Sequence, residues 1–241
     1  MILRLWSGRL LPGREAALMH RLRTAIPHVA ATDVIDFTYG VRHDGDRMSF
    51  IVLSDWSDYD AVRVAAGGDP SGTVTGQTMD DLFETCQAEM YERLPPDPTP
   101  LDAGEGRVIG VVSGRVIPQH EASAQRMVDG SARAALDAGA LAAHLGRRLD
   151  GELTRILVVV VWPKRSAMAR FVRSREMPAL DPAFTAHLVD WRFETYTMLS
   201  PERLMLPADA GPAVIVVDHE GRYVDTTPAI EAVLGVPGEV L

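Results

Sequence analysis

The chain has 241 residues, of which 46% are hydrophobic and 24% are charged, an ordinary globular composition that suffices for one to three domains. The formal net charge is −9 at pH 7, and lysine and arginine form no long runs, so this segment is not expected to bind nucleic acid directly. Cys86 is the only cysteine, which excludes an intramolecular disulfide and favours a reducing compartment. The longest apolar run, Ile156 to Trp162, is far shorter than the ~20 residues of a membrane helix. We therefore expect a soluble, cytoplasmic protein that does not enter a membrane.

Residues 1–94 predict an α+β unit with the element order β-α-β-β-α-β. Pro27 is expected to end the first helix, Ser57 to cap the next one, and Asp44-Gly45 to form a tight hairpin turn. Apolar residues at helical spacing separate the helices from the β-compatible segments. The predicted strands are 2–10, 34–42, 47–55 and 86–94, and the predicted helices are 14–26, 57–66 and 79–83.

A proline-rich linker over 95–106 is followed by a second unit, 107–199, with the same predicted order of elements. The prolines of the linker favour an extended, semi-rigid spacer. The predicted strands of the second unit are 108–117, 141–149, 153–162 and 191–199, and the predicted helices are 121–137, 166–174 and 183–188.

A short phrase that occurs in both units indicates a duplication. Ser7-Gly8-Arg9-Leu10-Leu11-Pro12 returns as Ser113-Gly114-Arg115-Val116-Ile117-Pro118, an offset of 106 residues. The same offset, without a gap, places Gly40 on Gly146, Arg42 on Arg148, Asp44-Gly45 on Asp150-Gly151 and Trp56 on Trp162. These identities fall at turns and junctions, where a shared fold would need them.

The predicted units cannot stand alone, because a β-α-β-β-α-β unit places both helices on one face of its sheet and leaves the other face apolar. Two such units in one chain can bury those faces against each other as an intramolecular pseudo-dimer. With its Ser-Gly-Arg junctions and its Trp56 and Trp162 strand ends, the chain resembles the dimeric α/β-barrel superfamily, and in particular its antibiotic-biosynthesis-monooxygenase branch. The resemblance implies two tandem ferredoxin-like units that form one barrel.

The C-terminal segment follows a second linker, 200–211, and has a different pattern. Residues 212–241 predict a strand, a tight turn, a second strand and a helix with Thr227 at its N-cap and Pro228 at its first position. This segment resembles the start of a PAS sensory domain, although Thr227 replaces the Asn that is common before that proline. Because a PAS core needs ~100 residues, we expect the protein to continue beyond Leu241 with the rest of this domain and an output domain. The alternative is that the segment packs elsewhere.

Haem is one ligand that the superfamily resemblance implies. Its haem-degrading members place an iron-ligating histidine on the short helix before the last strand, where this chain has His187. The positions of their other two catalytic residues hold Ala65 and Phe171 in place of Trp, and Ser7 and Ser113 in place of Asn. Haem degradation is therefore not expected, and His187 is either a haem ligand or an exposed, structural histidine.

Other candidate ligand-binding residues are polar or aromatic. Cofactor-free oxygenation would need aromatic or basic side chains to deprotonate a substrate, and Arg9 or Arg115 could bind an anionic group through two hydrogen bonds. Packing in the core is the competing interpretation for the aromatic residues, and a fold-specific hydrogen bond is the competing one for the arginines. The full candidate set is Ser113, Arg115, His144, Trp162, Phe171 and His187, with Trp6, Tyr39 and Trp56 as further aromatic candidates.

Three functional hypotheses follow from these patterns. The first is a ligand-sensing or regulatory module of a bacterial signalling or transcription-control protein, which binds a small hydrophobic or haem-like ligand in the barrel units. The second is a cofactor-independent monooxygenase that acts on an aromatic polyketide-type substrate. The third is a structural or dimerisation unit without a ligand. A homodimer is compatible with each of them.

Overall fold

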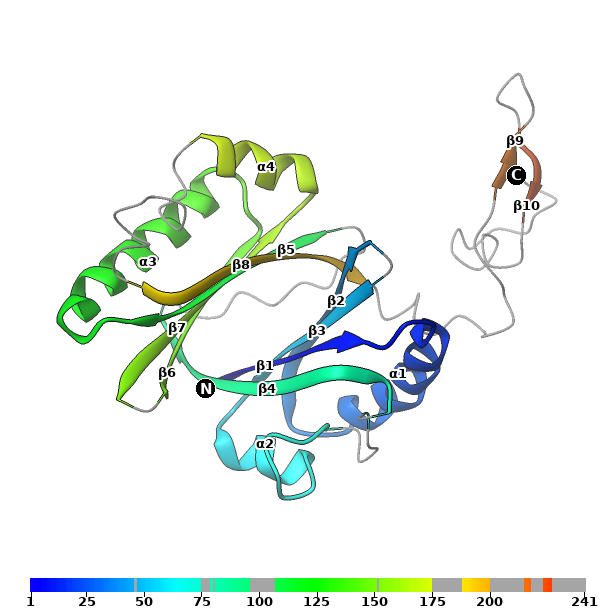
Figure 1. Cartoon of the computed structure of the whole chain (residues 1–241), viewed down its shortest axis with the longest axis horizontal. Coiled ribbons are helices and arrows are strands. Elements are labelled where there is room, and N and C mark those ends of the chain that lie inside the picture. Colours follow the sequence, from blue (N-terminus) through cyan, green and yellow to red (C-terminus); the bar gives the residue numbers. More distant parts are fainter. Residues whose placement is uncertain are drawn as a thin grey trace.

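The computed structural model describes residues 1–45, 47–74, 79, 81–95, 107–150, 152–174, 188–199, 215–217 and 223–226. They form an α+β protein in which eight antiparallel strands close into one barrel and the helices lie on its outside (Figure 1). Two further strands near the C-terminus pair only with each other.

The first half has the element order that the sequence predicts. Its long helix is amphipathic, and the buried residues Leu18, Leu22 and Ile26 lie on the face that contacts the sheet. The elements are β1 (Ile2–Leu10), α1 (Glu15–Ala30), β2 (Val34–Asp44), β3 (Arg47–Trp56), α2 (Tyr59–Ala65) and β4 (Phe83–Leu94).

The second half repeats this order, with one 3-10 turn before its long helix. Small side chains, Ala124 and Ala132, let that helix approach the sheet closely. The elements are β5 (Val108–Val116), η1 (Pro118–His120), α3 (Glu121–Asp137), β6 (Ala142–Asp150), β7 (Leu153–Trp162), α4 (Arg165–Arg173) and β8 (Leu188–Leu199).

Two seams join the halves into a closed barrel with the strand order β1-β3-β2-β8-β5-β7-β6-β4. At one seam β2 pairs with β8, from Tyr39 opposite Leu199 to Val41 opposite Thr197. At the other seam β4 pairs with β6, from Glu92 opposite Arg147 to Leu94 opposite Leu145. The seams contain equivalent strands of the two halves, and closure leaves the barrel without a free edge.

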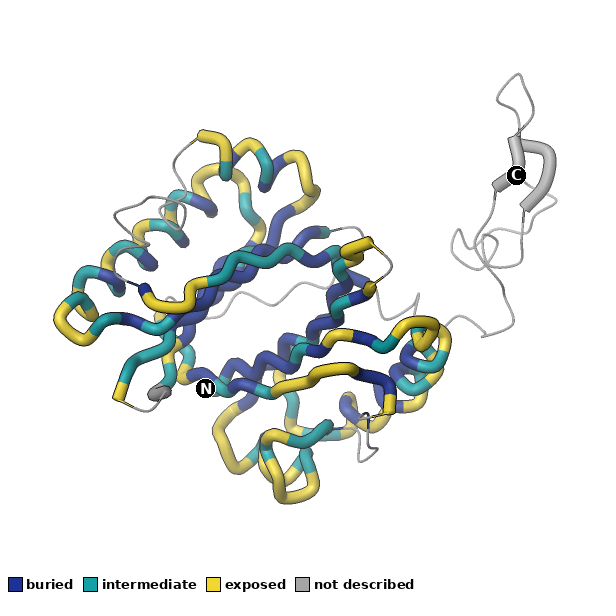
Figure 2. Tube along the Cα trace, in the orientation of Figure 1, coloured by how far each residue is buried: buried dark blue, intermediate teal, exposed yellow. Residues whose placement is uncertain are grey.

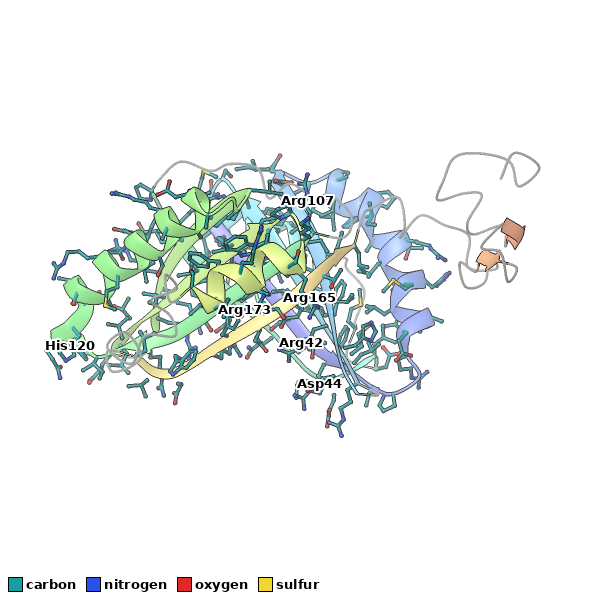
Figure 3. The ribbon with its side chains drawn as sticks, turned by 90° about the horizontal axis from the view of Figure 1, so that it is seen from above. Arg42, Asp44, Arg107, His120, Arg165 and Arg173 are labelled. Atoms are coloured by element: carbon teal, nitrogen blue, oxygen red, sulfur yellow. The ribbon has the colours of Figure 1, made fainter. Side chains whose placement is uncertain are left out.

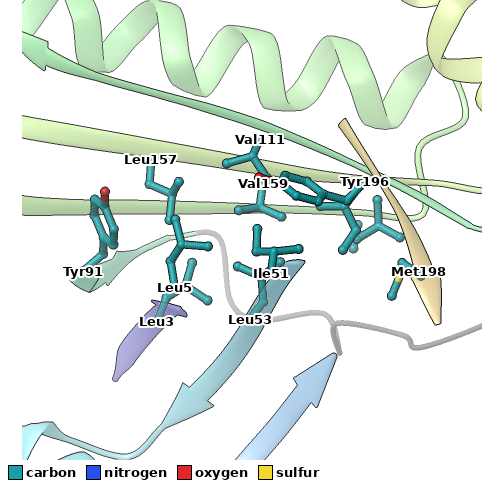
Figure 4. Close-up of a cluster of buried hydrophobic side chains, with 13 residues drawn as sticks. Leu3, Leu5, Ile51, Leu53, Tyr91, Val111, Leu157, Val159, Tyr196 and Met198 are labelled. Carbon is teal, nitrogen blue, oxygen red and sulfur yellow. The ribbon is translucent and has the colours of Figure 1, made fainter. Parts of the chain in front are cut away.

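The core has one layer inside the barrel and further layers outside it. Figure 4 shows the inner layer, in which side chains from both halves meet. Outside the barrel, α1 and α2 cover the strands of the first half and α3 and α4 cover those of the second half (Figures 1 and 2). The inner layer consists of Leu3, Leu5, Ile51, Leu53, Tyr91, Ile109, Val111, Ala142, Leu157, Val159, Val161, Tyr196 and Met198.

Two predicted helix boundaries in the first half are wrong. Pro27 lies inside α1, which continues to Ala30 because the buried Val29 holds the last turn against the core. A proline removes only one backbone donor, and the N–H of Ala31 still bonds to the carbonyl oxygen of Pro27 at 3.2 Å. The cap of α2 is Asp58, not Ser57, and its Oδ1 accepts from the N–H of Ala61 at 2.9 Å.

The short helix predicted over 79–83 is also wrong where the structure describes it. The N–H of Leu82 donates to the carbonyl oxygen of Met79 at 2.9 Å in a turn, and β4 begins at Phe83, three residues earlier than expected. Phe83 is drawn into the strand because its ring packs edge-on against Trp6, 5.0 Å between centroids. The strand predicted to begin at 191 likewise begins at Leu188. The helix predicted over 183–188 is wrong at Leu188, which belongs to β8, and its other residues lie outside the described residues.

The C-terminal segment is described only at its two predicted strands. Ile215–Val217 and Tyr223–Thr226 form an antiparallel pair, in agreement with the predicted hairpin. Both linkers and the predicted helix after Thr227 lie outside the described residues, except for the first residue of the first linker. No helix in the described part of the chain is long and apolar enough to span a membrane.

Candidate functional site

The first candidate site is a cavity of about 50 Å³ between α1 and the outer face of the first half's sheet. Its walls are largely apolar and include the rings of Trp6, Tyr39 and Trp56. The buried guanidinium of Arg4 is the only charged group among the described lining residues, and burial lowers its pKa to about 10. Arg4 donates to the carbonyl oxygens of Pro70, at 3.4 Å, and Gly72.

The equivalent cavity of the second half is smaller, about 30 Å³, and almost wholly apolar. Trp162 and Phe171 line it with tilted rings 5.2 Å apart. Ser131 supplies a buried hydroxyl that has no hydrogen-bond partner among the described residues. Gly110 stands where the first half has Arg4, so the second cavity has no cation at this position.

The described walls of these two cavities contain no group that could act as a general base near neutral pH. Arg4, Tyr39, Ser54 and Thr73 are the polar residues of the first cavity, and no Asp, Glu or His lines either one. Burial raises the pKa of Tyr39, so its phenol stays protonated. The cavities therefore offer hydrogen-bond donors and apolar surface, which suit binding better than proton abstraction.

The barrel interior carries a second, polar arrangement that repeats at both seams. At the β2–β8 seam, Arg42 pairs with Glu194 at 2.9 Å, and its guanidinium carbon lies 5.5 Å from the ring centroid of Tyr196. Arg42 is labelled beside β8 in Figure 3. At the β4–β6 seam, Arg148 pairs with Glu89 at 2.7 Å and lies 5.5 Å from the ring centroid of Tyr91. Each seam is thus closed by the same Arg–Glu–Tyr group.

Arg192 connects the two groups across the interior. Its Nη2 lies 3.2 Å from Oε2 of Glu89, and its Nε lies 3.9 Å from Oε2 of Glu194. The same Nε donates to Oγ of Ser113 at 3.0 Å. Arg155 adds a further guanidinium, with Nε 3.9 Å from Oε1 of Glu89. We call these charged residues the polar layer, which consists of Arg42, Glu89, Arg148, Arg155, Arg192 and Glu194.

A cavity of about 350 Å³ opens beside the polar layer at one end of the barrel. Unlike the helix–sheet cavities, it has a mainly polar wall, with Arg9, Arg42 and Arg192 as cations and Glu194 as the only carboxylate among the described lining residues. We call it the barrel-end cavity. Its lining consists of Ser7, Gly8, Arg9, Arg42, Ser49, Thr85, Cys86, Gln87, Arg192, Glu194 and Tyr196.

A separate buried polar chain, Asp55–Arg93–His144, crosses from the first half to the second. Arg93 forms an ion pair with Asp55 and a hydrogen bond with Nδ1 of His144, and all three side chains are almost fully buried. Burial and the neighbouring Arg93 lower the pKa of His144 to about 3, which keeps the ring neutral. Burial raises the pKa of Asp55, against the opposing effect of Arg93.

The structure distributes the residues proposed from the sequence over different places. Trp162 and Phe171 line the second helix–sheet cavity, Ser113 is held by Arg192, and His144 belongs to the buried chain. Arg115 forms an ion pair with Asp190, so an anionic ligand would have to compete with this carboxylate. His187 lies outside the described residues.

The polar layer is not among the sites predicted from the sequence, although the sequence contains one signal for it. The offset of 106 residues that aligns the two Ser-Gly-Arg phrases also aligns Arg42 with Arg148. A charged residue that recurs inside a strand, rather than at a turn, is a candidate for a role in the barrel interior. No group of three or more His, Cys, Asp or Glu side chains suited to a metal ion occurs in the part of the chain that the structure describes.

Comparison with known proteins supports the fold. No family model matches the chain, and no curated protein matches it by sequence. A candidate monooxygenase from Fusobacterium nucleatum superposes with a TM-score of 0.63 at 8% identity, over 83% of this chain and 92% of that chain. The chain has the dimeric α/β-barrel fold.

Two further solved structures share this barrel. An anthrone oxidase-like protein has a TM-score of 0.54 at 13% identity and covers 82% of this chain and 91% of its own. A candidate chlorite dismutase has a TM-score of 0.53 at 11% identity and covers 85% of this chain and 97% of its own. At such identities the likeness establishes the fold alone.

Proposed function

We propose that the chain is a ligand-binding module without catalytic activity, in which the helix–sheet cavity of the first half receives a small, mainly apolar molecule. The observation that carries this proposal is the wall of that cavity, which combines aromatic surface with the buried Arg4 and lacks a general base among the described residues. An apolar ligand with one acceptor group would bury its ring against Trp6 and Trp56 and accept a hydrogen bond from Arg4.

The proposed role of the module is regulatory. Two tandem ferredoxin-like units would form the sensor, and the segment 212–241 would begin a PAS-like region that passes the signal to an output domain. The paired strands Ile215–Val217 and Tyr223–Thr226 support this proposal, because a PAS-like start requires such a hairpin. Within the sensor, the inner core layer would couple the two halves, because it draws side chains from both.

The alternative function is a cofactor-independent monooxygenase for an aromatic substrate. It is favoured by the likeness of the fold to a candidate monooxygenase and to an anthrone oxidase-like protein. Two observations oppose it. The described walls of the two helix–sheet cavities hold no base, and the volumes of these cavities, about 50 and 30 Å³, are far smaller than the roughly 300 Å³ or more of a typical small-molecule site. We expect no oxygen uptake with anthrone-type substrates.

The proposal is tested by ¹⁹F NMR with 4-fluorophenol, a single ring with one polar group. We expect saturable binding with a Kd of the order of 1 mM, since few heavy atoms can contribute. Ala25→Phe places a ring in the space between α1 and the sheet that the ligand would occupy, so it should weaken binding at least roughly tenfold. Ala135→Phe, which fills the second cavity, is the matched control and should leave binding unchanged. Equal effects of both substitutions, or no binding to the wild type, would contradict the proposal.

Haem is a separate proposal that rests on His187. The two helix–sheet cavities do not themselves fit haem, because no histidine or cysteine lines their described walls and His144 is held by Arg93. Protonated Tyr39 is a poor iron ligand as well. Absorbance titration with haemin tests the matter. A Soret shift that His187→Ala abolishes would support a haem site, and the absence of any shift would remove haem from consideration.

A further inference from the structure

We propose that the barrel-end cavity binds a small organic dianion, such as a dicarboxylate or a phosphate ester. The site shares no residue with the helix–sheet cavities, so it does not depend on the function proposed above. Its strands come from both halves, with β1 to β4 on one side and β8 on the other.

The first argument is charge. The described lining carries three arginines and one carboxylate, Glu194, which is already paired with Arg42 at 2.9 Å. Glu89, the other carboxylate of the polar layer, is shared by Arg148, Arg155 and Arg192. The polar layer therefore has four guanidinium groups for two carboxylates. An excess of cations in a chain of net charge −9 is a local feature that attracts anions into the cavity.

The second argument is that hydrogen-bond donors remain unused. The side chain of Arg9 forms no hydrogen bond or ion pair with any residue that the structure describes. Among the described residues, the guanidinium group of Arg42 donates only through Nη1, to Glu194 at 2.9 Å. A guanidinium group has five N–H donors arranged to match carboxylate or phosphate oxygens in pairs. Two such groups on neighbouring faces of one cavity suit a ligand with two negative charges.

The third argument is size and the chemistry of the wall. A volume of about 350 Å³ lies in the range of roughly 300–1,000 Å³ that small-molecule sites occupy. Ser7, Ser49, Thr85 and Gln87 add uncharged donors and acceptors around the arginines, and Tyr196 supplies one aromatic face. The wall suits a polar ligand, in contrast to the apolar helix–sheet cavities.

The test is isothermal titration of the full chain at low ionic strength with succinate, inorganic phosphate and acetate. We expect 1:1 binding of at least one dianion, at least roughly tenfold tighter than acetate, because two charges engage two or more guanidinium groups. Tighter binding of succinate would identify the ligand as a dicarboxylate, and tighter binding of phosphate would identify a phosphate ester. Raising the salt concentration should weaken binding.

The decisive variant is Arg9→Gln, since Arg9 is exposed and its replacement should leave the unfolding midpoint unchanged. We expect it to weaken binding of the dianion roughly fivefold or more. The control is Arg147→Gln, which removes the same charge from the outer face of β6, where Arg147 pairs with Glu92. The proposal is overturned if neither dianion binds at about 10 mM, or if Arg9→Gln weakens binding no more than Arg147→Gln does.

Discussion

Among single residues, His144 shows a large change of pKa on folding. In the folded chain it is buried against Arg93 and its pKa is lowered to about 3 from an ordinary value of 6.5. The unfolded chain therefore binds more protons between these two values, and stability must fall as the pH falls through this range. Asp55 acts in the opposite sense, because its raised pKa favours the protonated, folded form.

Replacement of His144 by Gln should remove much of this acid sensitivity. The amide oxygen of Gln can still accept a hydrogen bond from Arg93 but does not titrate. We expect the wild type to lose stability between pH 6.5 and pH 4 with an additional slope of up to about 1.4 kcal/mol per pH unit relative to the variant. Urea unfolding at several pH values measures the difference. Parallel pH profiles for the two proteins would show that His144 does not titrate on unfolding.

Contacts between individual side chains are the feature of the structure that the sequence predicts least well. The sequence marks Ser113, Arg115 and His144 as unusual, but contact partners such as Arg192 and Arg93 come from strands that are distant along the chain. Their approach depends on how the barrel closes, and no local pattern encodes that. Arg42 and Arg148 are the exception, because their recurrence at one offset was visible before the fold was known.

Among the elements, the strands at the two seams depend on a pair of equivalent glycines. A Cβ at Gly40 would lie 2.9 Å from Cβ of Tyr196, and one at Gly146 would lie 2.7 Å from Cβ of Tyr91. Both glycines let a tyrosine of the other half cross the strand closely. This contact gives a physical reason for the recurrence of glycine at these two positions.

Gly146→Ala should therefore loosen the β4–β6 seam. Because the new methyl group would meet the backbone-proximal atoms of Tyr91, which cannot swing away, we expect a loss of roughly 1–3 kcal/mol in the free energy of unfolding. Gly130→Ala is the matched control, since nothing lies within 4 Å of a Cβ there and the residue is inside α3. It should stabilise the chain by about 0.5–1 kcal/mol. Denaturant unfolding compares the two, and equal effects would contradict this account of the seam.

Most elements were predictable from their local patterns, and the errors have physical causes. The strands 2–10 and 153–162 and the helix 121–137 were predicted to the residue, because apolar spacing and turn residues bound them. The helix end predicted at Pro27 is wrong because the tertiary contacts of Val29 outweigh the loss of one backbone hydrogen-bond donor. The early start of β4 depends on Phe83 packing against Trp6, a contact that periodicity cannot reveal.

At the scale of the whole molecule, the two halves share one barrel rather than standing as separate sheets. The sequence predicted that the apolar sheet faces meet within one chain, and the inner core layer shows such a meeting. The resemblance to the superfamily also implied that the two units form one barrel. The strand pairs that close it, β2–β8 and β4–β6, and their register come from the structure alone. Edge pairing depends on register between distant strands, which a single sequence does not specify.

The closure of the barrel within one chain is tested most directly by a disulfide across the β4–β6 seam. Glu92 and Arg147 are direct cross-strand partners with exposed side chains, and such positions lie within the Cα separation that a disulfide spans. The variant Glu92→Cys/Arg147→Cys, in a Cys86→Ser background, would be oxidised mildly and examined on a non-reducing gel. Glu84→Cys/Arg147→Cys is the control, because position 84 lies eight residues farther along β4, roughly 26 Å away.

Closure within one chain predicts near-complete conversion of the seam variant to a faster-migrating, cross-linked monomer, while the control remains reduced. Cross-linked dimers instead of monomers would show that the seam forms between chains, and the absence of any cross-link would show that β4 and β6 do not pair.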